Sequence, residues 1–350
     1  MFEEMAKKPA SWLTGEGPES EIVLSSRIRF ARNIADLKFP PSADTDIRDK
    51  IIDFVYSAFS SMDLIKRGNF YNSNDINPLD QSFLVERHLV SPEFMKDGTG
   101  RGLYIEDSER MSIMVNEEDH IRLQVISSGL SMNECWEYAC KVDQGLARKL
   151  KYAYDDHFGF LTSCPTNVGT GLRASILIHM PGLVLTKEID NVIARISKVG
   201  LVVRGFYGEG TDVLGNLFQI SNQTTLGRSE EEIIDSLAKV TQQIIEYELN
   251  SQETLMKDAS DQIEDKVWRS YGILKHARVL NSGEVMNLLS ALRLGVSLKL
   301  FDKVSLHQIN ELLIITQPAH LQKYYKREMD TAERDMVRSD LVRERLQGKQ

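Results

Sequence analysis

Four short segments of the sequence concentrate the side chains that could do chemistry. They are SSRIR (residues 25–29), NEEDHIR (116–122), CPTNVGTGLRAS (164–175) and RGFYGEGTD (204–212). Each contains arginine, which binds phosphate oxygens through a planar, permanently charged fork. The sequence lacks the nucleotide-binding signatures GxxxxGK[ST] and GxGxxG, and it lacks the HRD and DFG pair of motifs. Several arginines that converge on a triphosphate could bind it in place of such a signature. The candidate phosphate-binding arginines are Arg27, Arg29, Arg122, Arg173 and Arg204. The alternative is that they are ordinary exposed or salt-bridged residues, which is the more common role of scattered arginines.

The first segment has its two arginines two positions apart. Arg27 and Arg29 follow Ile22 and Leu24 in an extended-looking stretch. Alternate residues of a strand share one face, so both guanidinium groups are predicted to point the same way. Two like charges on one face favour a bound anion, although a pair of ordinary surface arginines would show the same spacing.

The second segment packs acidic residues tightly after an apolar run. Glu117, Glu118 and Asp119 precede His120 and Arg122. A solvated turn would explain this density of charge. A functional interpretation uses one carboxylate as a base or clamp for a cationic acceptor, and its neighbours to hold water on Mg²⁺.

The third and fourth segments are glycine-rich loops. Gly169 and Gly171 follow Cys164 immediately before a strand, and glycine lets the backbone approach a ligand closely. Glu209 lies five residues after Arg204 in a loop suited to closing over a substrate. A tight turn is the alternative for the third segment, and a plain hairpin is the alternative for the fourth. His88 could contact a nucleotide base, but taken alone it is expected to be a surface histidine.

Composition narrows the class of protein. The chain has 350 residues, of which 42% are hydrophobic and 27% charged, so it can form one large domain with a small one, or two comparable domains. A net charge of −9 argues against broad nucleic-acid binding. No apolar run is long enough to span a membrane, and the start MFEEMAKKPASW lacks the apolar core of a signal peptide, so we expect a cytoplasmic protein. Its three cysteines predict neither a disulfide framework nor a zinc site.

The elements that must position these segments are mixed helices and strands. Apolar residues at helical spacing predict helices over 46–62 and 133–150. Short strand patterns cover 102–107, 110–116, 173–180, 200–208 and 215–222. The spacer between the first two of these is too short for a parallel crossover, so at least some of the sheet should be antiparallel, which favours α+β over a doubly wound fold. The fold class we predict is α+β, with a largely antiparallel sheet flanked by helices.

The last third of the chain is predicted to be entirely helical. Ser229 with Glu232 forms a capping box that opens a helix to about Leu249. Helical patterns then follow one another through the charged stretch 319–346. We therefore predict a catalytic domain over residues 1–255 and an all-helical C-terminal domain over 256–350.

Taken together, the four motifs resemble the phosphagen kinase family, ATP:guanido phosphotransferases that move the γ-phosphoryl group of ATP to a guanidinium nitrogen. The match covers about residues 20–250, and CPTNVGTGLR is similar to the family signature CPTN[LIV]GT. The resemblance implies a glutamine-synthetase-like catalytic fold, with ATP and Mg²⁺ as cofactors. It implies that ATP is bound by Ser25, Ser26, Arg27, Ile28, Arg29, His88, Arg122, Arg173, Ala174, Ser175, Ile176, Leu177, Arg204, Gly205, Phe206, Tyr207 and Gly208.

The resemblance also implies catalytic roles. Glu118 would be the general base, and Glu209 the second acid that clamps the acceptor guanidinium. Cys164 would be an electrostatic helper and not a covalent nucleophile. Glu117 and Asp119 would orient Mg²⁺ through water, with no direct protein ligand to the metal.

Two departures from the small-molecule phosphagen kinases point to a protein acceptor. Those enzymes have an N-terminal helical domain before the SxRxR motif, whereas SSRIR begins at Ser25 and leaves no room for one in this sequence. They also lack a helical region after about residue 255. Both departures resemble the bacterial protein-arginine kinases, whose RDxxRA motif binds phosphoarginine and regulates activity. The corresponding allosteric pocket here would be Arg334, Asp335, Arg338 and Ser339, with Ser in place of the motif's Ala.

The resulting hypothesis is a protein-arginine kinase that marks proteins for Clp-dependent degradation in a stress response. The implied partners are protein substrates with exposed arginines, such as a heat-shock repressor and unfolded proteins, a small zinc-binding activator protein, the Clp chaperone-protease and a second copy in a homodimer. Nucleic acid and membrane are not expected as partners. The alternatives are a kinase for free arginine or another small guanidino compound, and a non-catalytic adaptor that reads phosphoarginine.

Overall fold

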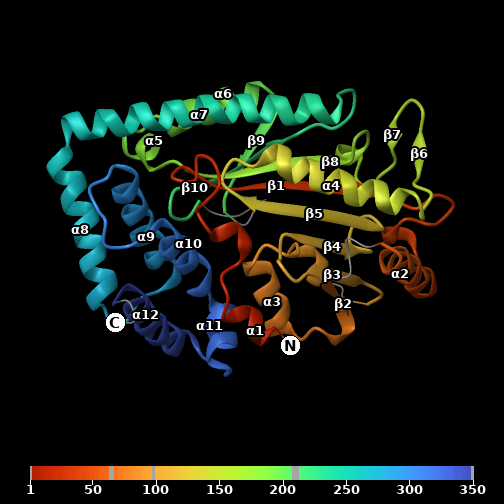
Figure 1. The fold of residues 1–350 in the computed structure, drawn as a ribbon, viewed down its shortest axis with the longest axis horizontal. Helices are drawn as coiled ribbons and strands as arrows, with labels where there is room; N and C mark the ends of the chain where they lie inside the picture. Colours follow the sequence, from red (N-terminus) through yellow and green to blue (C-terminus); the bar gives the residue numbers. More distant parts are fainter. Residues whose placement is uncertain (1, 63–66, 97–98, 207–212, 348–350) are drawn as a thin grey trace.

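An eight-stranded antiparallel sheet forms the centre of the molecule (Figure 1). The computed structural model describes residues 2–62, 67–96, 99–206 and 213–347. The strand order is β2-β3-β4-β5-β1-β8-β10-β9. In chain order the strands are β1 (Val23–Arg32), β2 (Gly68–Asn72), β3 (Gly102–Glu106), β4 (Met111–Val115), β5 (Ile121–Ser128), β8 (Leu172–His179), β9 (Leu201–Arg204) and β10 (Leu217–Asn222).

The helices of the first two thirds of the chain lie around this sheet, while the short hairpin β6 (Tyr154–Asp155) and β7 (Gly159–Phe160) projects beyond its edge (Figure 1). The predicted antiparallel α+β class and the helices expected near 46–62 and 133–150 are confirmed. The helices of the first two thirds of the chain are α1 (Glu3–Ala6), α2 (Thr45–Ser60), α3 (Pro78–Glu86), α4 (Met132–Ala147), α5 (Pro181–Leu185) and α6 (Ile189–Lys198).

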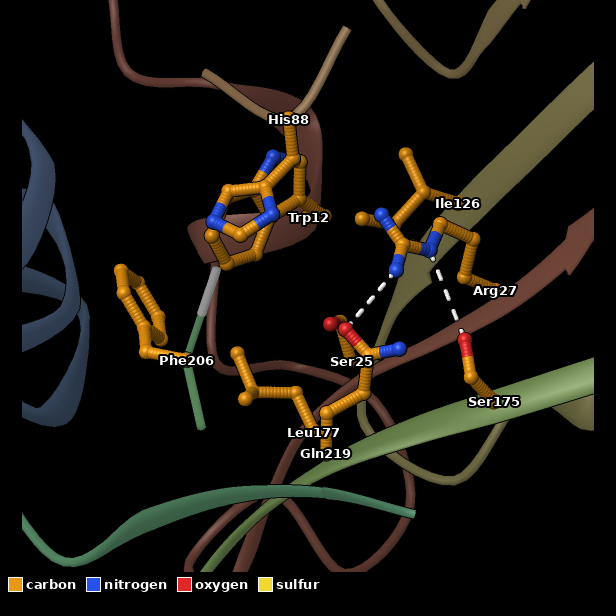
Figure 2. Close-up of a pocket in the computed structure, with 9 residues that line it drawn as sticks. All are labelled: Trp12, Ser25, Arg27, His88, Ile126, Ser175, Leu177, Phe206 and Gln219. Atoms are coloured by element: carbon orange, nitrogen blue, oxygen red, sulfur yellow. Dashed lines mark hydrogen bonds between the residues drawn. The ribbon is translucent and has the colours of Figure 1, made fainter. Parts of the chain in front are cut away.

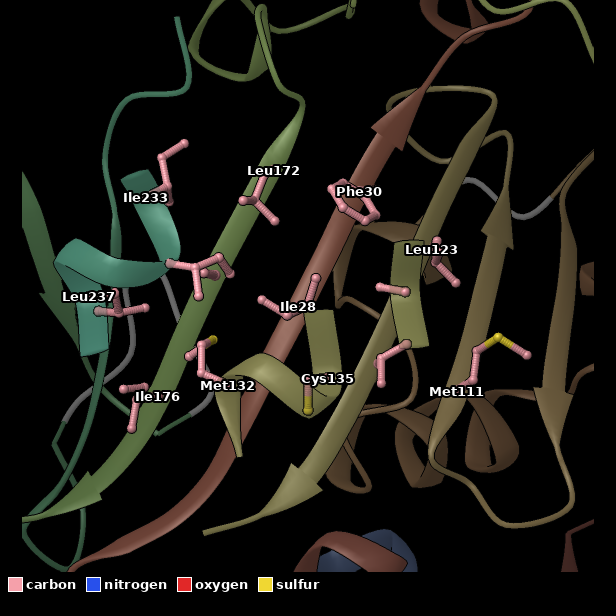
Figure 3. Packing of buried hydrophobic residues seen from close by; sticks show 14 of the residues in the cluster. Ile28, Phe30, Met111, Leu123, Met132, Cys135, Leu172, Ile176, Ile233 and Leu237 are labelled. Atoms are coloured by element: carbon pink, nitrogen blue, oxygen red, sulfur yellow. The ribbon is translucent and has the colours of Figure 1, made fainter. Parts of the chain in front are cut away.

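One face of the sheet is the apolar core. Ile28 of β1 and Ile176 of β8 point toward Met132 and Cys135 of α4, as Figure 3 shows. Leu237 of α7 (Glu230–Asp258) packs on the same cluster. Because successive residues of a strand alternate between faces, this packing directs the intervening polar residues to the opposite face.

The chain after α7 is also helical, and these later helices cover part of that opposite face (Figure 1). Leu24, Ile126 and Leu177 of the sheet join a second apolar cluster with residues of this helical region and with Trp12. None of the described helices has the length and apolar character needed to cross a membrane. The helices are α8 (Ser260–His276), α9 (Ser282–Ser297), α10 (Leu306–Ile315), α11 (Pro318–Tyr325) and α12 (Thr331–Gln347).

Helix boundaries differ from the expectation in two places. The Ser229 capping box is present, but α7 continues to Asp258, so the domain boundary predicted at residue 255 falls in its last turn. The charged stretch 319–346 is split between α11 and α12, because Lys326 adopts the left-handed conformation with φ of 56° and ends α11. The division into two domains stays a prediction.

Candidate active site

The five candidate arginines line a single cavity of about 730 Å³ on the polar face of the sheet. Arg27 and Arg29 enter it from β1, and the alternation predicted from their spacing holds. The other three come from β5, β8 and β9. The cavity is therefore built by strands that are far apart in the sequence but adjacent in the sheet.

The strand register brings like charges close together. Arg29 lies directly opposite Arg173 across the β1–β8 pair, and Arg122 lies opposite Ala31 across the β1–β5 pair. Burial, with Arg122 and Arg173 nearby, lowers the pKa of Arg27 to about 10. Burial, with Arg27, Arg122 and Arg173 nearby, lowers the pKa of Arg29 as well. A cluster of cations whose charged forms are disfavoured is stabilised by a bound polyanion.

Glu117 is the acidic partner of this cluster. Its Oε1 accepts hydrogen bonds from Arg122 Nη1 and from the Ser91 hydroxyl, both at 2.6 Å. Burial alone would raise the pKa of Glu117, but Arg122 and Ser91 shift it below its ordinary value. Burial also acts to lower the pKa of Arg122, but Glu117 more than offsets it, so this pKa is raised. Glu117 and Arg122 are therefore both charged and fixed in place.

Glu118 differs from its neighbour in both exposure and charge environment. It is exposed at the cavity wall, and its Oε2 lies 3.5 Å from the amide Nδ2 of Asn167. Partial burial of the carboxylate, together with the negative charges of Asp119 and Glu117, raises the pKa of Glu118. A carboxylate with a raised pKa and access to a cavity suits a general base.

Asp119 and Asn33 hold the acidic segment against the cysteine loop. Asp119 Oδ1 accepts hydrogen bonds from Asn33 Nδ2 at 2.6 Å and from the Ser163 amide at 2.7 Å. Asn33 also donates to the Leu161 carbonyl at 3.1 Å, and its Oδ1 accepts from the His120 amide. Sequence reasoning missed Asn33, since an asparagine after a strand has no distinctive pattern. Oδ1 of Asp119 is therefore occupied by contacts within the protein. The role of Asp119 in holding water on Mg²⁺ stays a prediction.

Cys164 lies at the start of a shaped loop that lines the same cavity. Its Sγ is 3.0 Å from the hydroxyl of Thr166. At the end of the loop, Gly171 has φ of +60°, and a Cβ there would lie 2.5 Å from the Ala31 carbonyl oxygen. The glycine is required by both conformation and space, and the loop therefore approaches β1 closely.

His88 lies in a smaller recess beside the arginines. Figure 2 shows its ring near Trp12 and Phe206, with ring centroids at 5.2 Å and 5.0 Å. Arg27 closes the recess by donating to Gln219 Oε1 at 2.9 Å and to Ser175 Oγ at 3.4 Å. Burial, with Arg27 and Arg29 nearby, lowers the pKa of His88 to about 3. The expectation of a surface histidine is wrong, because the distant residues Trp12 and Phe206 cover it.

Comparisons with known proteins agree with this geometry. The model of the ATP:guanido phosphotransferase C-terminal catalytic domain matches residues 50–251, and that of the protein-arginine kinase McsB C-terminal domain matches residues 260–350. The protein-arginine kinase of Halothermothrix orenii is 45% identical over 340 residues, covering 97% of both chains. That of Bacillus cereus is 46% identical over 337 residues, covering 96% of this chain and 95% of its own. The chain belongs to the protein-arginine kinase family.

Solved phosphagen kinase structures share the fold of this protein-arginine kinase. A taurocyamine kinase from Schistosoma mansoni, solved with components of a transition state analogue, superimposes with a TM-score of 0.62 at 27% identity. That match covers 67% of this chain and 34% of the duplicated taurocyamine kinase. Lombricine kinase gives a TM-score of 0.60 at 25% identity, covering 70% of each chain. The protein is thus an ATP:guanido phosphotransferase, and ATP is the phosphoryl donor of its family.

The side chains of several residues predicted as nucleotide contacts face away from the cavity. The side chains of Ile28, Ala174 and Ile176 are fully buried in the apolar core, on the face opposite the cavity. The Ser26 hydroxyl donates to the Gly129 carbonyl at 2.8 Å. These four side chains belong to the alternate positions of β1 and β8, so they point away from the cavity, and a contact of these residues with a nucleotide would be made by the backbone. Their neighbours Ser25, Ser175 and Leu177 line the small recess beside the cavity.

The glycine-rich loop is described only in part. Arg204 lines the large cavity, Gly205 is buried, and Phe206 lines the small recess. Tyr207, Gly208 and Glu209 lie outside the described residues. The role of Glu209 as second acid therefore rests on the sequence resemblance.

The four residues of the predicted phosphoarginine pocket lie on α12, but two of them are buried. Arg338 is 1% exposed, donates to the carbonyls of Thr316 and Leu280, and pairs with Asp335. Ser339 is buried and hydrogen-bonds the carbonyl of Arg278. Without the resemblance this stretch would be interpreted as a solvated helix face, which is wrong for Arg338 and Ser339. Arg334 is only partly exposed, and it donates to the Met329 carbonyl at 2.8 Å.

Proposed function

We propose that the large cavity binds ATP and transfers its γ-phosphoryl group to an arginine side chain of a protein. The observation that carries the proposal is the convergence of the five candidate arginines beside Glu118, whose pKa is raised. A triphosphate relieves the repulsion among these cations, and the names of the relatives support a protein-borne acceptor.

The reaction we propose is an in-line transfer without a phosphoenzyme. Glu118 accepts a proton from the attacking guanidinium nitrogen, because a protonated, delocalised guanidinium is a poor nucleophile. The nitrogen forms a bond to the γ-phosphorus while the bond to the β,γ-bridging oxygen breaks, and ADP leaves. Glu209 holds the other side of the acceptor fork, and Cys164 stabilises the acceptor charge without forming a covalent bond.

The arginines act by position and charge. Arg27, Arg29, Arg122 and Arg173 neutralise the triphosphate and keep the γ-phosphoryl group in line, which is most of what phosphoryl transfer requires. Arg204 completes the set on β9. His88, neutral at pH 7, contacts the adenosine side through an uncharged ring.

Mg²⁺ fits the acidic side of the cavity through water. Among the residues that the structure describes, no group of three or more His, Cys, Asp or Glu side chains is arranged to hold a metal ion. Glu117 and Asp119 line the cavity and would hold metal-bound waters, while ATP phosphates supply direct ligands. When bound, Mg²⁺ neutralises charge that develops on the phosphates.

The helical region supplies the regulatory part of the proposal. We propose that Arg334, Asp335, Arg338 and Ser339 form a second pocket for phosphoarginine. Arg334 is the member best placed to meet a ligand, because it is the partly exposed arginine of the four. Arg338 would support the pocket by holding α12 to α10 through Thr316.

The cellular role that we propose rests on the family resemblance. The kinase would work in the cytoplasm as a homodimer, with a small zinc-binding protein as activator. It would modify a heat-shock repressor and unfolded proteins during stress, and the modified proteins would pass to the Clp chaperone-protease.

A comparison of acceptors tests the proposed function. ADP release is measured with unfolded casein and with free arginine at matched guanidinium concentrations. Turnover with casein and little with arginine is the expected result. Brisk turnover only with free arginine would overturn the protein acceptor, and Glu118→Ala provides the background rate.

A further inference from the structure

The end of α3 joins the helical region to the nucleotide cavity. Helix α3 packs on α11, and the ring centroids of Phe83 in α3 and His320 in α11 are 4.4 Å apart. The residues that follow Phe83 run into His88 and Ser91, both of which line the large cavity. Two charged residues at this junction, Glu86 and Arg87, have no part in the proposed chemistry.

Glu86 fixes the last turn of α3 to the first turn of α11. Its two carboxylate oxygens accept hydrogen bonds from the backbone amides of Ala319 and His320, each at 2.8 Å. A helix N-terminus has unpaired amides and a partial positive charge, so an acceptor there is favourable. The contact joins residues that are more than 230 positions apart in the sequence.

Arg87 is held from three separate segments. Its Nε and Nη2 donate to the two carboxylate oxygens of Glu109, each at 2.6 Å, in a bidentate pair. Nη1 and Nη2 also donate to the Lys8 carbonyl at 3.2 Å, and Nη1 lies 3.1 Å from His320 Nε2. Arg87 is 1% exposed. A buried bidentate pair of this kind gives both strength and a fixed geometry.

The next residue is in an unusual backbone conformation. His88 has φ of 60°, which is rare for a residue with a side chain. Its carbonyl accepts a hydrogen bond from Gln124 Nε2 at 2.6 Å, and its ring lies beside Trp12 and Phe206. Such a conformation persists only where the surroundings impose it. The anchoring of Arg87 supplies that constraint on one side.

The same segment reaches the acidic partner of the arginines. Ser91 lies three residues after His88, and its hydroxyl donates to Glu117, which pairs with Arg122. A shift of residue 87 would therefore move the His88 wall of the cavity. It would also move the Ser91 contact that helps to fix Glu117.

We propose that Arg87, anchored by Glu109, is a positioning residue for nucleotide binding. Through the rigid turn at His88 it holds one wall of the ATP cavity at the distance that the arginines require. The inference rests on the proposed function, since it takes the cavity to be the ATP site. Arg87 itself is not among the residues that line the large cavity, so it would act through His88 and Ser91.

The test replaces Glu109 by glutamine, which keeps the shape but removes the charge partner of Arg87. Asp80→Asn is the matched control, because the buried Asp80–Lys323 pair joins α3 to α11 at the other end of α3. Affinity for ATP is measured by calorimetry, kcat and KM by steady-state kinetics, and stability by urea unfolding. Arg29→Met, which removes a proposed phosphate contact, reports whether the cavity binds ATP.

The expected result is a loss of ATP affinity of about tenfold to a hundredfold for Glu109→Gln, with kcat changed much less. Asp80→Asn should lower the urea midpoint comparably and leave ATP affinity within about twofold, since its pair lies away from the cavity. Equal ATP affinity in Glu109→Gln and the wild type would overturn the inference. So would an equal loss in Asp80→Asn, which would indicate general loosening of the helix interface.

One further variant, together with Arg29→Met, separates failure of the positioning role from failure of the cavity assignment. If Glu109→Gln does not fold, Arg87→Lys replaces it, since lysine retains the charge but cannot form the bidentate fork. The ATP affinities of Arg87→Lys and the wild type are then compared in the same way. If Arg29→Met binds ATP as the wild type does, the cavity assignment fails; if only Glu109→Gln and Arg87→Lys bind normally, the positioning role alone fails.

Discussion

The cavity on the sheet and the buried face of α12 both concentrate arginine, but they balance its charge in opposite ways. In the cavity, Arg29 of β1 lies opposite Arg173 of the neighbouring strand β8, and the pKa of Arg29 is lowered by burial and by like charges. On α12, Arg338 is enclosed by two carbonyl oxygens and a carboxylate. The first arrangement would be completed by an anion from solution, whereas in the second Nε and Nη1 of the arginine already have acceptors within the protein.

The difference teaches that burial alone does not identify a functional arginine. Arg338 is among the largest fully buried side chains, yet its partners are structural. The sign of the surrounding charge separates the two cases. A cluster whose members lower one another's pKa indicates a ligand site, whereas an arginine that is paired with carbonyl and carboxylate oxygens serves packing even where it borders a pocket.

The largest expected effect is on the chemical step in the cavity. Glu118→Gln should lower kcat by about 10² to 10⁴-fold, because the guanidinium nitrogen loses its proton acceptor. It should not lower stability at neutral pH. The folded state raises the pKa of Glu118, so ionising this carboxylate opposes folding and glutamine removes that cost. Rates of phosphoarginine formation and urea unfolding curves check both parts, and unchanged activity would refute the assignment.

Matched substitutions in the two arginine clusters test the comparison itself. Arg338→Met should lower the free energy of unfolding by about 3 kcal/mol or more, because Asp335 and two carbonyl groups lose their partner. Arg29→Met should leave stability without ligand unchanged or higher, because it removes repulsion from Arg27, Arg122 and Arg173. Equal destabilisation of both variants, measured by urea unfolding, would break the distinction.

Ligand linkage gives a smaller effect on the same pair of variants. ATP at about one hundred times its Kd should raise the free energy of unfolding by about 2.7 kcal/mol in the wild type. Arg338→Met should keep this increment, and Arg29→Met should lose most of it at the same ATP concentration. Thermal unfolding with and without ATP measures the increment. A normal increment in Arg29→Met would place the nucleotide elsewhere.

The pH dependence of the reaction is the finest test. Glu118 must be ionised to accept a proton, so kcat/KM should rise with pH through its pKa and then level off. Because burial and the charges of Asp119 and Glu117 raise this pKa, the acidic limb should lie above that of an ordinary glutamate. The limb should disappear in Glu118→Gln. Its persistence in that variant would assign the titration to another group.

Local sequence patterns predicted the elements and much of the polar face. Two-residue spacing was enough to place Arg27 and Arg29 together, since alternation along a strand is a local property. The same rule, applied to each position, would have placed the side chains of Ile28, Ala174 and Ile176 on the face away from the cavity. The helix at Ser229 was predicted from its capping box, which is also local.

The remaining features depend on contacts between distant segments. Five arginines converge only because β5, β1, β8, β10 and β9 are adjacent in the sheet, and that order cannot be derived from any one motif. His88 is buried by Trp12 and Phe206, and Asn33 joins two loops through hydrogen bonds that no spacing reveals. The resemblance to phosphagen kinases supplied what local patterns could not.

The most direct test of the central claim locates the transferred phosphate. Wild-type protein and Glu118→Gln are incubated with ATP and unfolded casein, and the products are analysed by mass spectrometry under conditions that preserve the acid-labile P–N bond. The account predicts phosphate on arginine side chains of casein with the wild type and almost none with the variant. Phosphate on serine, threonine or histidine, or equal arginine labelling by both proteins, would contradict it.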